Sequence, residues 1–173
     1  MANTNLPKSF EIQDKGKQET PMDWVCAASY AGKHGDVVYL DSNGRTTATE
    51  GVVLGIQDGG ITSVATGLVE TTASATAGAS KIKVFTNPGI IFKGQISSWA
   101  LTEPYTTRSE AACYDIAGSA GAQYVNKSAT GNDTIKVIQI STEYDTGKES
   151  EVGSYAKCLF QFNQYAHYRG VIA

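Results

Sequence analysis

The residue types that do chemistry are few in this sequence, and their spacing matches no catalytic motif. The two histidines, His34 and His167, lack both the i+4 partner and the neighbouring cysteine of a zinc site. Gly147-Lys148 lacks the upstream glycine and the following Ser or Thr of a phosphate-binding loop. The Gly-x-Ser-x-Gly elbow of many serine hydrolases is absent. We therefore expect no enzyme, no catalytic residue, no cofactor and no metal.

The carboxylates have simpler explanations than catalysis or metal binding. Asp41-Ser42-Asn43-Gly44 begins like a calcium loop but lacks the later ligands, including the glutamate at the twelfth position. Its Asn-Gly pair predicts a hairpin turn, because these residues adopt positive φ angles readily. Asp115 and Asp133 have no paired acid or base at motif spacing and are interpreted as solvated or capping groups.

The cysteines and the hydrophobic pattern indicate a protein made in a reducing compartment. Cys26, Cys113 and Cys158 are odd in number and widely spaced, which predicts reduced and mostly buried thiols. Residues 1–19 are polar and contain no run of signal-peptide length. No window approaches the roughly 18 apolar residues of a membrane span. We expect synthesis in the cytosol, no export and no membrane partner.

Charge and composition narrow the class of protein further. Fourteen Lys and Arg against 17 Asp and Glu give a net charge of -3, which argues against a nucleic-acid partner. The 173 residues fit one domain, or one domain with an extended arm. Gly, Ala, Ser and Thr are abundant, and this composition favours strands joined by turns.

Periodicity predicts about seven short strands and one short helix. Residues 80–85 alternate polar and apolar side chains, as a half-buried strand does, and Asn87-Pro88-Gly89 turns the chain back. The low-complexity run 71–80 is interpreted as a flexible loop. Ser109 is a candidate cap for a helix over 108–117 that Gly118 would end. The predicted strands cover residues 35–40, 51–56, 61–69, 80–85, 90–96, 134–141 and 157–162.

The two ends of the chain hold the candidate contact residues. Residues 1–21 are predicted to be an extended arm and residues 22–173 the folded domain. The arm is either plain terminal disorder or a segment that orders on a partner through Leu6, Phe10 and Ile12.

Near the C-terminus, aromatic residues follow one another closely. Phe160 and Phe162 are expected in the core, because they share one face of a predicted strand. Tyr165, Tyr168 and Arg169 are expected at an interface with a partner or a second copy, because a tyrosine buries area while its hydroxyl stays satisfied.

One stretch of the sequence resembles a known family. Gly35-Asp36-Val37-Val38-Tyr39-Leu40-Asp41, then Thr46-Thr47-Ala48-Thr49, then Gly51-Val52-Val53-Leu54-Gly55-Ile56 resembles the capsid decoration (cement) proteins of tailed bacteriophages. The resemblance covers about residues 35–56. It implies a mainly β, compact β-barrel or β-sandwich-like (β-tulip-like) domain, to which the patterns described above add the one short helix and the extended N-terminal arm.

The resemblance also implies a function and a location. It implies a homotrimer that binds the major capsid protein on the outer surface of the virion after synthesis in the host bacterial cytoplasm. Such a protein stabilises the expanded capsid lattice because it bridges capsid subunits. The family has no catalytic residues to transfer.

Three other interpretations stay open from the sequence. The first is another virion component, such as a head-fibre base, a tail protein or a minor capsid subunit. The second is a small enzyme, whose least unfavourable site would combine Cys26, His34 and Asp36. The third is a carbohydrate-binding module, in which Trp24, Trp99 and Tyr105 would form the stacking platform.

Overall fold

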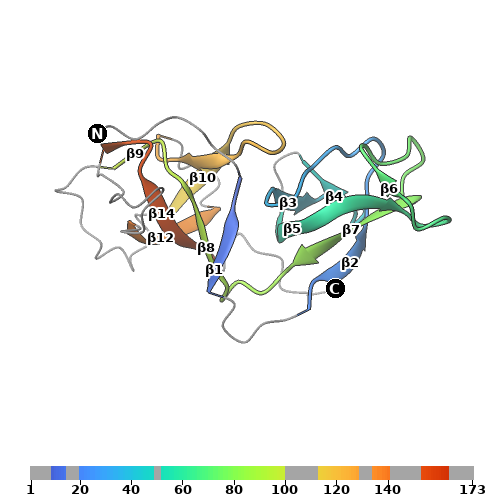
Figure 1. Cartoon of the computed structure of the whole chain (residues 1–173), viewed down its shortest axis with the longest axis horizontal. Coiled ribbons are helices and arrows are strands. Elements are labelled where there is room, and N and C mark those ends of the chain that lie inside the picture. The colour runs from blue at the N-terminus through green and yellow to red at the C-terminus, as the bar shows by residue number, and fades with distance from the viewer. Residues whose placement is uncertain are drawn as a thin grey trace.

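Two antiparallel β-sheets lie side by side along the long axis of the chain, as a computed structural model shows (Figure 1). The structure describes residues 9–14, 20–48, 52–99, 113–128, 134–140 and 153–163. None of these residues is helical, and the mainly β fold expected from composition is confirmed.

The first sheet is one continuous segment of the chain, whereas the second combines the N-terminal strand with the strands that follow the first sheet. The first contains β2 (Met22–Val25), β3 (Val37–Leu40), β4 (Thr46–Thr47), β5 (Val52–Ser63) and β7 (Ser80–Phe85), ordered β2-β7-β5-β3-β4, with β6 (Val69–Glu70) paired to β5. The second contains β1 (Glu11–Asp14), β8 (Ile91–Gln95), β10 (Cys113–Ala117), β11 (Tyr124–Asn126), β12 (Ile135–Ile140) and β14 (Lys157–Phe162), ordered β1-β8-β14-β12-β10-β11. A separate pair joins β9 (Ser98–Trp99) and β13 (Gly153–Ser154).

Each sheet closes into a barrel through one parallel β-bridge. The bridge directly follows β2 in the first sheet and β8 in the second. Cys26 bridges Thr46 in the first sheet, and Ile96 bridges Val125 in the second. The next amide donates across each seam at 2.9 Å, from Ala27 to the Thr46 carbonyl and from Ser97 to the Val125 carbonyl. Each bridge joins the two outer strands of a five-stranded unit, which an open sheet would leave as edges. We call these closed sheets the first and the second barrel.

The two barrels repeat one five-stranded unit. Numbered along the chain within each unit, the strands follow the same spatial order 1-5-4-2-3, with antiparallel neighbours and one parallel closing bridge. The seam bonds also correspond, because Cys26 N donates to Ser80 O and Ile96 N donates to Ala156 O, both at 2.8 Å. The chain is therefore two structural copies of one unit, a relation that the sequence analysis did not predict.

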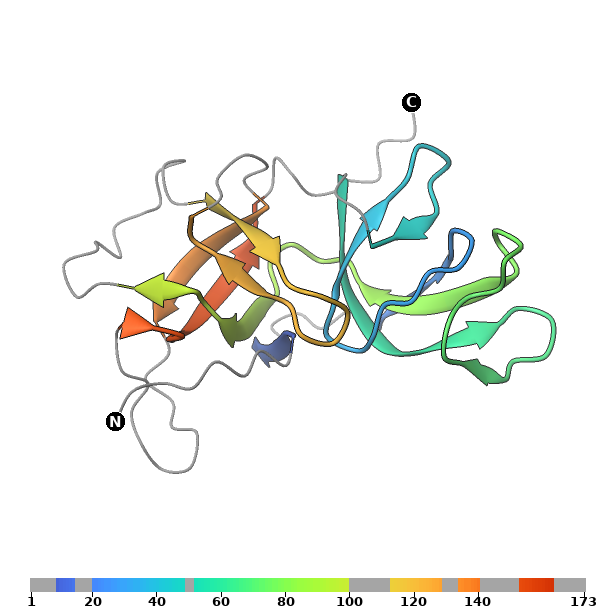
Figure 2. The same ribbon diagram turned by 90° about the horizontal axis from the view of Figure 1, so that it is seen from above.

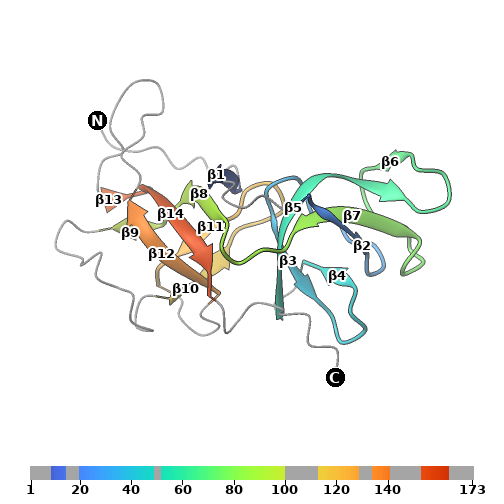
Figure 3. The ribbon, with the colours of Figure 1, turned by 90° about the horizontal axis from the view of Figure 1, so that it is seen from below.

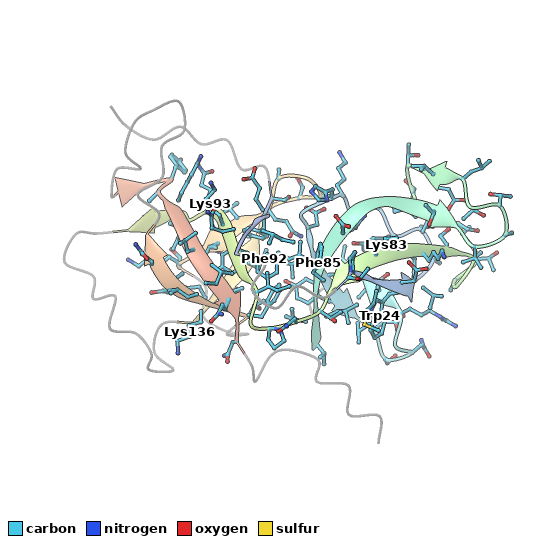
Figure 4. The ribbon with its side chains drawn as sticks, turned by 60° about the horizontal axis from the view of Figure 1, so that its bottom comes forward. Trp24, Lys83, Phe85, Phe92, Lys93 and Lys136 are labelled. Atoms are coloured by element: carbon cyan, nitrogen blue, oxygen red, sulfur yellow. The ribbon has the colours of Figure 1, made fainter. Side chains whose placement is uncertain are left out.

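Strand β3 lies between the two barrels, and both of its faces are buried. Val38 and Leu40 of β3 point into the first barrel, while Val37 and Tyr39 belong to the hydrophobic cluster that continues through the second barrel. All four β3 residues are buried as a result. Figure 4 shows Phe85 and Phe92 at this junction, and both belong to the shared cluster. One continuous core thus joins the two repeats.

Part of the predicted arm lies inside the fold. Phe10 is only 2% exposed, and its ring packs edge-to-face on Phe160 with the ring centroids 4.9 Å apart. The ring occupies the space beside Gly94, where any side chain would overlap it. Trp24 stands at the corresponding position of the first barrel and packs against that barrel's core. In the second barrel the ring of Phe10 therefore occupies the space beside Gly94 of β8. In the first barrel the corresponding space is filled by Trp24, a residue of β2 itself.

The helix predicted over 108–117 is not found in its described part. Residues 113–117 form β10, while residues 108–112 lie outside the described residues. Pairing with β11 and β12 on both sides outweighs the weak helix preference of this Ala-containing run.

One further prediction about the first barrel is wrong. Residues 61–69 are not one strand, because β5 ends at Ser63 and a turn containing Gly67, with φ of 71°, leads to β6. Residues 71–79 form turns and loop, as predicted, and Ser80 begins β7. Within this loop Ala73 is buried, and its amide donates to the Tyr30 carbonyl at 2.7 Å.

Candidate functional site

The residues that would form an enzyme site occupy separate environments. Cys26 is buried inside the first barrel, and burial raises the pKa of its thiol, which disfavours the reactive thiolate. His34 is exposed, and its Nδ1 accepts a hydrogen bond from Gly59 N at 3.0 Å. Asp36 is buried at the junction between the barrels. Within the described ranges, no group of three or more His, Cys, Asp or Glu side chains is placed to hold a metal ion.

The aromatic platform of a carbohydrate-binding module is not assembled by the described strands. Trp24 lies on β2 of the first barrel, whereas Trp99 lies on β9, beside the second barrel (Figure 3). Tyr105 lies outside the described residues. The two tryptophans thus belong to opposite halves of the molecule.

The buried carboxylate of Asp36 joins three segments that are distant in the sequence. It accepts hydrogen bonds from Ser9 Oγ, from Lys33 N at 2.8 Å and from Gly121 N at 2.9 Å. Asp36 itself is 2% exposed. A buried carboxylate is stable only where donors replace its lost water, and these three donors do so.

The same network continues through Gln123 in the turn between β10 and β11. Gln123 N donates to Ser9 Oγ at 3.1 Å, and Gln123 Oε1 accepts from Val37 N at 2.6 Å. Figure 2 shows this turn of the second barrel reaching the first barrel. We call Ser9, Asp36, Gly121 and Gln123 the clasp. It holds the two barrels and the N-terminal segment in one fixed arrangement.

A nearly uncharged surface caps the far end of the first barrel. We call residues 59–80 the hairpin end; Glu70 is their only charged residue. Val64, Leu68 and Val69 are 52%, 69% and 77% exposed, and they lie within six residues of one another. Figures 1 and 3 place β6 at one extremity of the long axis, away from the second barrel. Several large apolar side chains gathered on such an end are typical of an interaction surface.

Hydrogen bonds hold the hairpin end in a defined shape. Ser63 N donates to Leu68 O at 2.9 Å, and Val64 N donates to Ala79 O at 2.8 Å. Ile61, at the base of the hairpin, is buried in the core of the first barrel. The exposed apolar side chains are therefore presented by an anchored backbone.

The outer face of the second barrel is chemically different. Alternation along β14 places Lys157, Leu159 and Gln161 outward, while Cys158, Phe160 and Phe162 point inward. Lys93 is opposite Leu159 and Lys136 is opposite Gln161, so these lysines share that outer face (Figure 4). The molecule thus has a lysine-bearing side and a nearly uncharged end.

The structure describes only some of the candidate contact residues. Phe10 is buried, so its ring offers no surface to a partner in this arrangement, and Ile12 is half-buried against the same core. The expected core positions of Phe160 and Phe162 are confirmed. The remaining candidates, Leu6, Tyr165, Tyr168 and Arg169, lie outside the described residues.

Sequence reasoning did not identify the clasp or the hairpin end. The charge-poor stretch 59–80 was visible in the sequence and could have signalled a surface contact. No local pattern signals the clasp, because Ser9 and Gln123 are 114 positions apart.

In comparisons with known proteins, no family model matches the chain, and no curated protein or solved structure matches it. Among the described residues, no helix is both long enough and apolar enough to cross a membrane.

Proposed function

We propose that the chain is a structural protein of a tailed-phage virion. It binds the outer surface of the expanded capsid as a homotrimer and stabilises the lattice by bridging major capsid protein subunits. The observation that carries this proposal is the position in the fold of residues 35–56, the segment that resembles decoration proteins. The described part of residues 35–56 includes β3, β4 and the start of β5, and β3 and β5 contribute side chains to both hydrophobic clusters.

The structure supports the proposal through rigidity. The two closed barrels are joined by the cluster that contains Val37, Phe85 and Phe92 and by the clasp, so surfaces at opposite ends of the molecule keep a fixed separation. A rigid spacer loses little conformational entropy when both ends bind neighbouring subunits at once. This property suits a protein that bridges subunits at a spacing set by the lattice.

The stabilising effect follows from selective binding. A protein that binds expanded subunits but not unexpanded ones shifts the equilibrium toward the expanded lattice by mass action. No bond is made or broken in this role.

The direct test is co-sedimentation of the purified chain with heads of the phage that encodes it, before and after expansion. We expect saturable binding to expanded heads and at least tenfold weaker binding to unexpanded ones. Electron microscopy of the decorated particles then locates the protein. Density on the tail or at a fibre base would replace the proposal with another virion role, and binding to neither particle form would refute it.

A further inference from the structure

We propose that the hairpin end, residues 59–80, is the surface through which copies of this chain associate about a rotation axis. The inference rests on the homotrimer of the proposed function and names the surface that would form it. It concerns self-association alone and does not require capsid binding.

The first argument is electrostatic. Next to a rotation axis, each side chain lies close to the same side chain of another copy, so a charge there repels its own image. The chain has 14 Lys and Arg and 17 Asp and Glu, yet only Glu70 falls within residues 59–80. Glu70 Oε2 also accepts a hydrogen bond from Ser80 Oγ, whose residue is buried, so this carboxylate is engaged within the chain.

The second argument is the apolar content of the tip. Val64, Leu68 and Val69 are each more than half exposed in the isolated chain. Burying these side chains against their copies removes apolar area from water, which is the main driving force of association. A capsid site chosen for charge complementarity would need several charged groups on this end, and residues 59–80 contain only Glu70.

The third argument is pre-organisation. Two hydrogen bonds of 2.9 Å close the turn: Ser63 N donates to Leu68 O, and Gly67 N donates to Ser63 O. Gly78 N donates to Cys26 O at 2.9 Å and ties the following loop to the barrel seam. Because the backbone is already fixed, association orders few additional groups.

The size of the surface sets the expected strength. The exposed part of the hairpin end is smaller than the roughly 20–30 residues per side of a standard stable interface. We therefore expect reversible association, with a dissociation constant between about micromolar and about millimolar. Association becomes complete when the copies are concentrated on a capsid.

The test is sedimentation velocity of the full chain over a concentration series that spans this range. The variant Val64→Thr/Leu68→Ser/Val69→Thr should raise the dissociation constant at least about tenfold, as loss of a contact centre does. The matched control is Met22→Thr/Val52→Thr, which alters two exposed apolar residues of the same barrel outside the hairpin end and should leave association unchanged. Far-UV circular dichroism establishes that all variants are folded.

A charge-insertion variant separates the electrostatic argument from simple loss of packing. Leu68→Lys should weaken association strongly at low salt and less at high salt, because salt screens repulsion between the copied charges. If the wild type associates and both hairpin variants have the same dissociation constant as the wild type, the inference is overturned. The proposed homotrimer is not contradicted by that result. A wild type that stays monomeric throughout would overturn both, while capsid binding is judged separately by co-sedimentation.

Discussion

At the scale of single residues, Asp36 shows how a buried charge can organise a β-protein. Its carboxylate is removed from water, and the donors that solvate it among the described residues are one hydroxyl and two backbone amides. Charge-assisted hydrogen bonds of this kind are stronger than neutral ones. Their donors come from three segments, so one side chain fixes the relation among them.

Replacing Asp36 should be far more costly than replacing an exposed aspartate. In Asp36→Ala, Ser9 Oγ and Gly121 N lose a charged acceptor, and we expect the free energy of unfolding to fall by about 3 kcal/mol or more. The control Asp23→Ala removes a carboxylate from an exposed ion pair with Lys81 and should cost less than about 1 kcal/mol. Urea unfolding of both variants measures the difference, and equal losses would contradict the role of the clasp.

At the scale of elements, β1 changes the interpretation of the N-terminus. Its pairing with β8 and the burial of Phe10 make Ser9–Asp14 part of the second barrel. A deletion of residues 1–21 would therefore remove core packing as well as any contact with a partner. Only a deletion that stops before Ser9 tests the arm without disturbing the fold.

Two truncations separate these roles. Deleting residues 1–8 should leave the unfolding midpoint within experimental error and should weaken capsid binding if Leu6 contacts the capsid. Deleting residues 1–14 also removes Phe10, Ser9 of the clasp and β1, and we expect a loss of at least about 3–5 kcal/mol, the cost of a buried phenylalanine alone. Thermal unfolding and co-sedimentation are measured on the same samples. If residues 1–8 can be removed with no loss of particle occupancy, the arm is not a binding element.

The elements also show which local patterns were sufficient for prediction. The alternation in 80–85 predicted β7, because a strand buried on one face alternates polar and apolar residues. The apolar run in 35–40 predicted β3, because a strand buried on both faces is apolar at successive positions. Residues 113–117 misled because a short run containing Ala, Cys and Ile suits a helix or a strand equally well locally. Pairing with β11 and β12 decides its structure, and those partners lie further along the chain.

At the scale of the whole molecule, two repeated barrels behave as one body. Their shared cluster includes Val37 and Phe85 from the first barrel and Phe92 and Phe160 from the second. The clasp adds hydrogen bonds across the same junction. Neither barrel can open without exposing part of this core.

We therefore expect the two barrels to unfold in a single transition. The single-tryptophan variants Trp99→Phe and Trp24→Phe leave Trp24 to report on the first barrel and Trp99 to report on the surroundings of β9. Their urea curves should coincide with each other and with far-UV circular dichroism, as two-state unfolding requires. Separate midpoints for the two tryptophans would show that the barrels are independent domains.

The sequence by itself determined the class of fold. Its small residues, turn signals and period-2 runs specify strands, because these are local consequences of backbone sterics and of one-sided burial. Only the tertiary structure decided that the strands form two repeats of one closed unit, that Phe10 fills the space beside Gly94 and that Asp36 joins Ser9 to Gly121. These features depend on contacts between residues far apart in the chain, and no local pattern encodes which distant partner a side chain will meet.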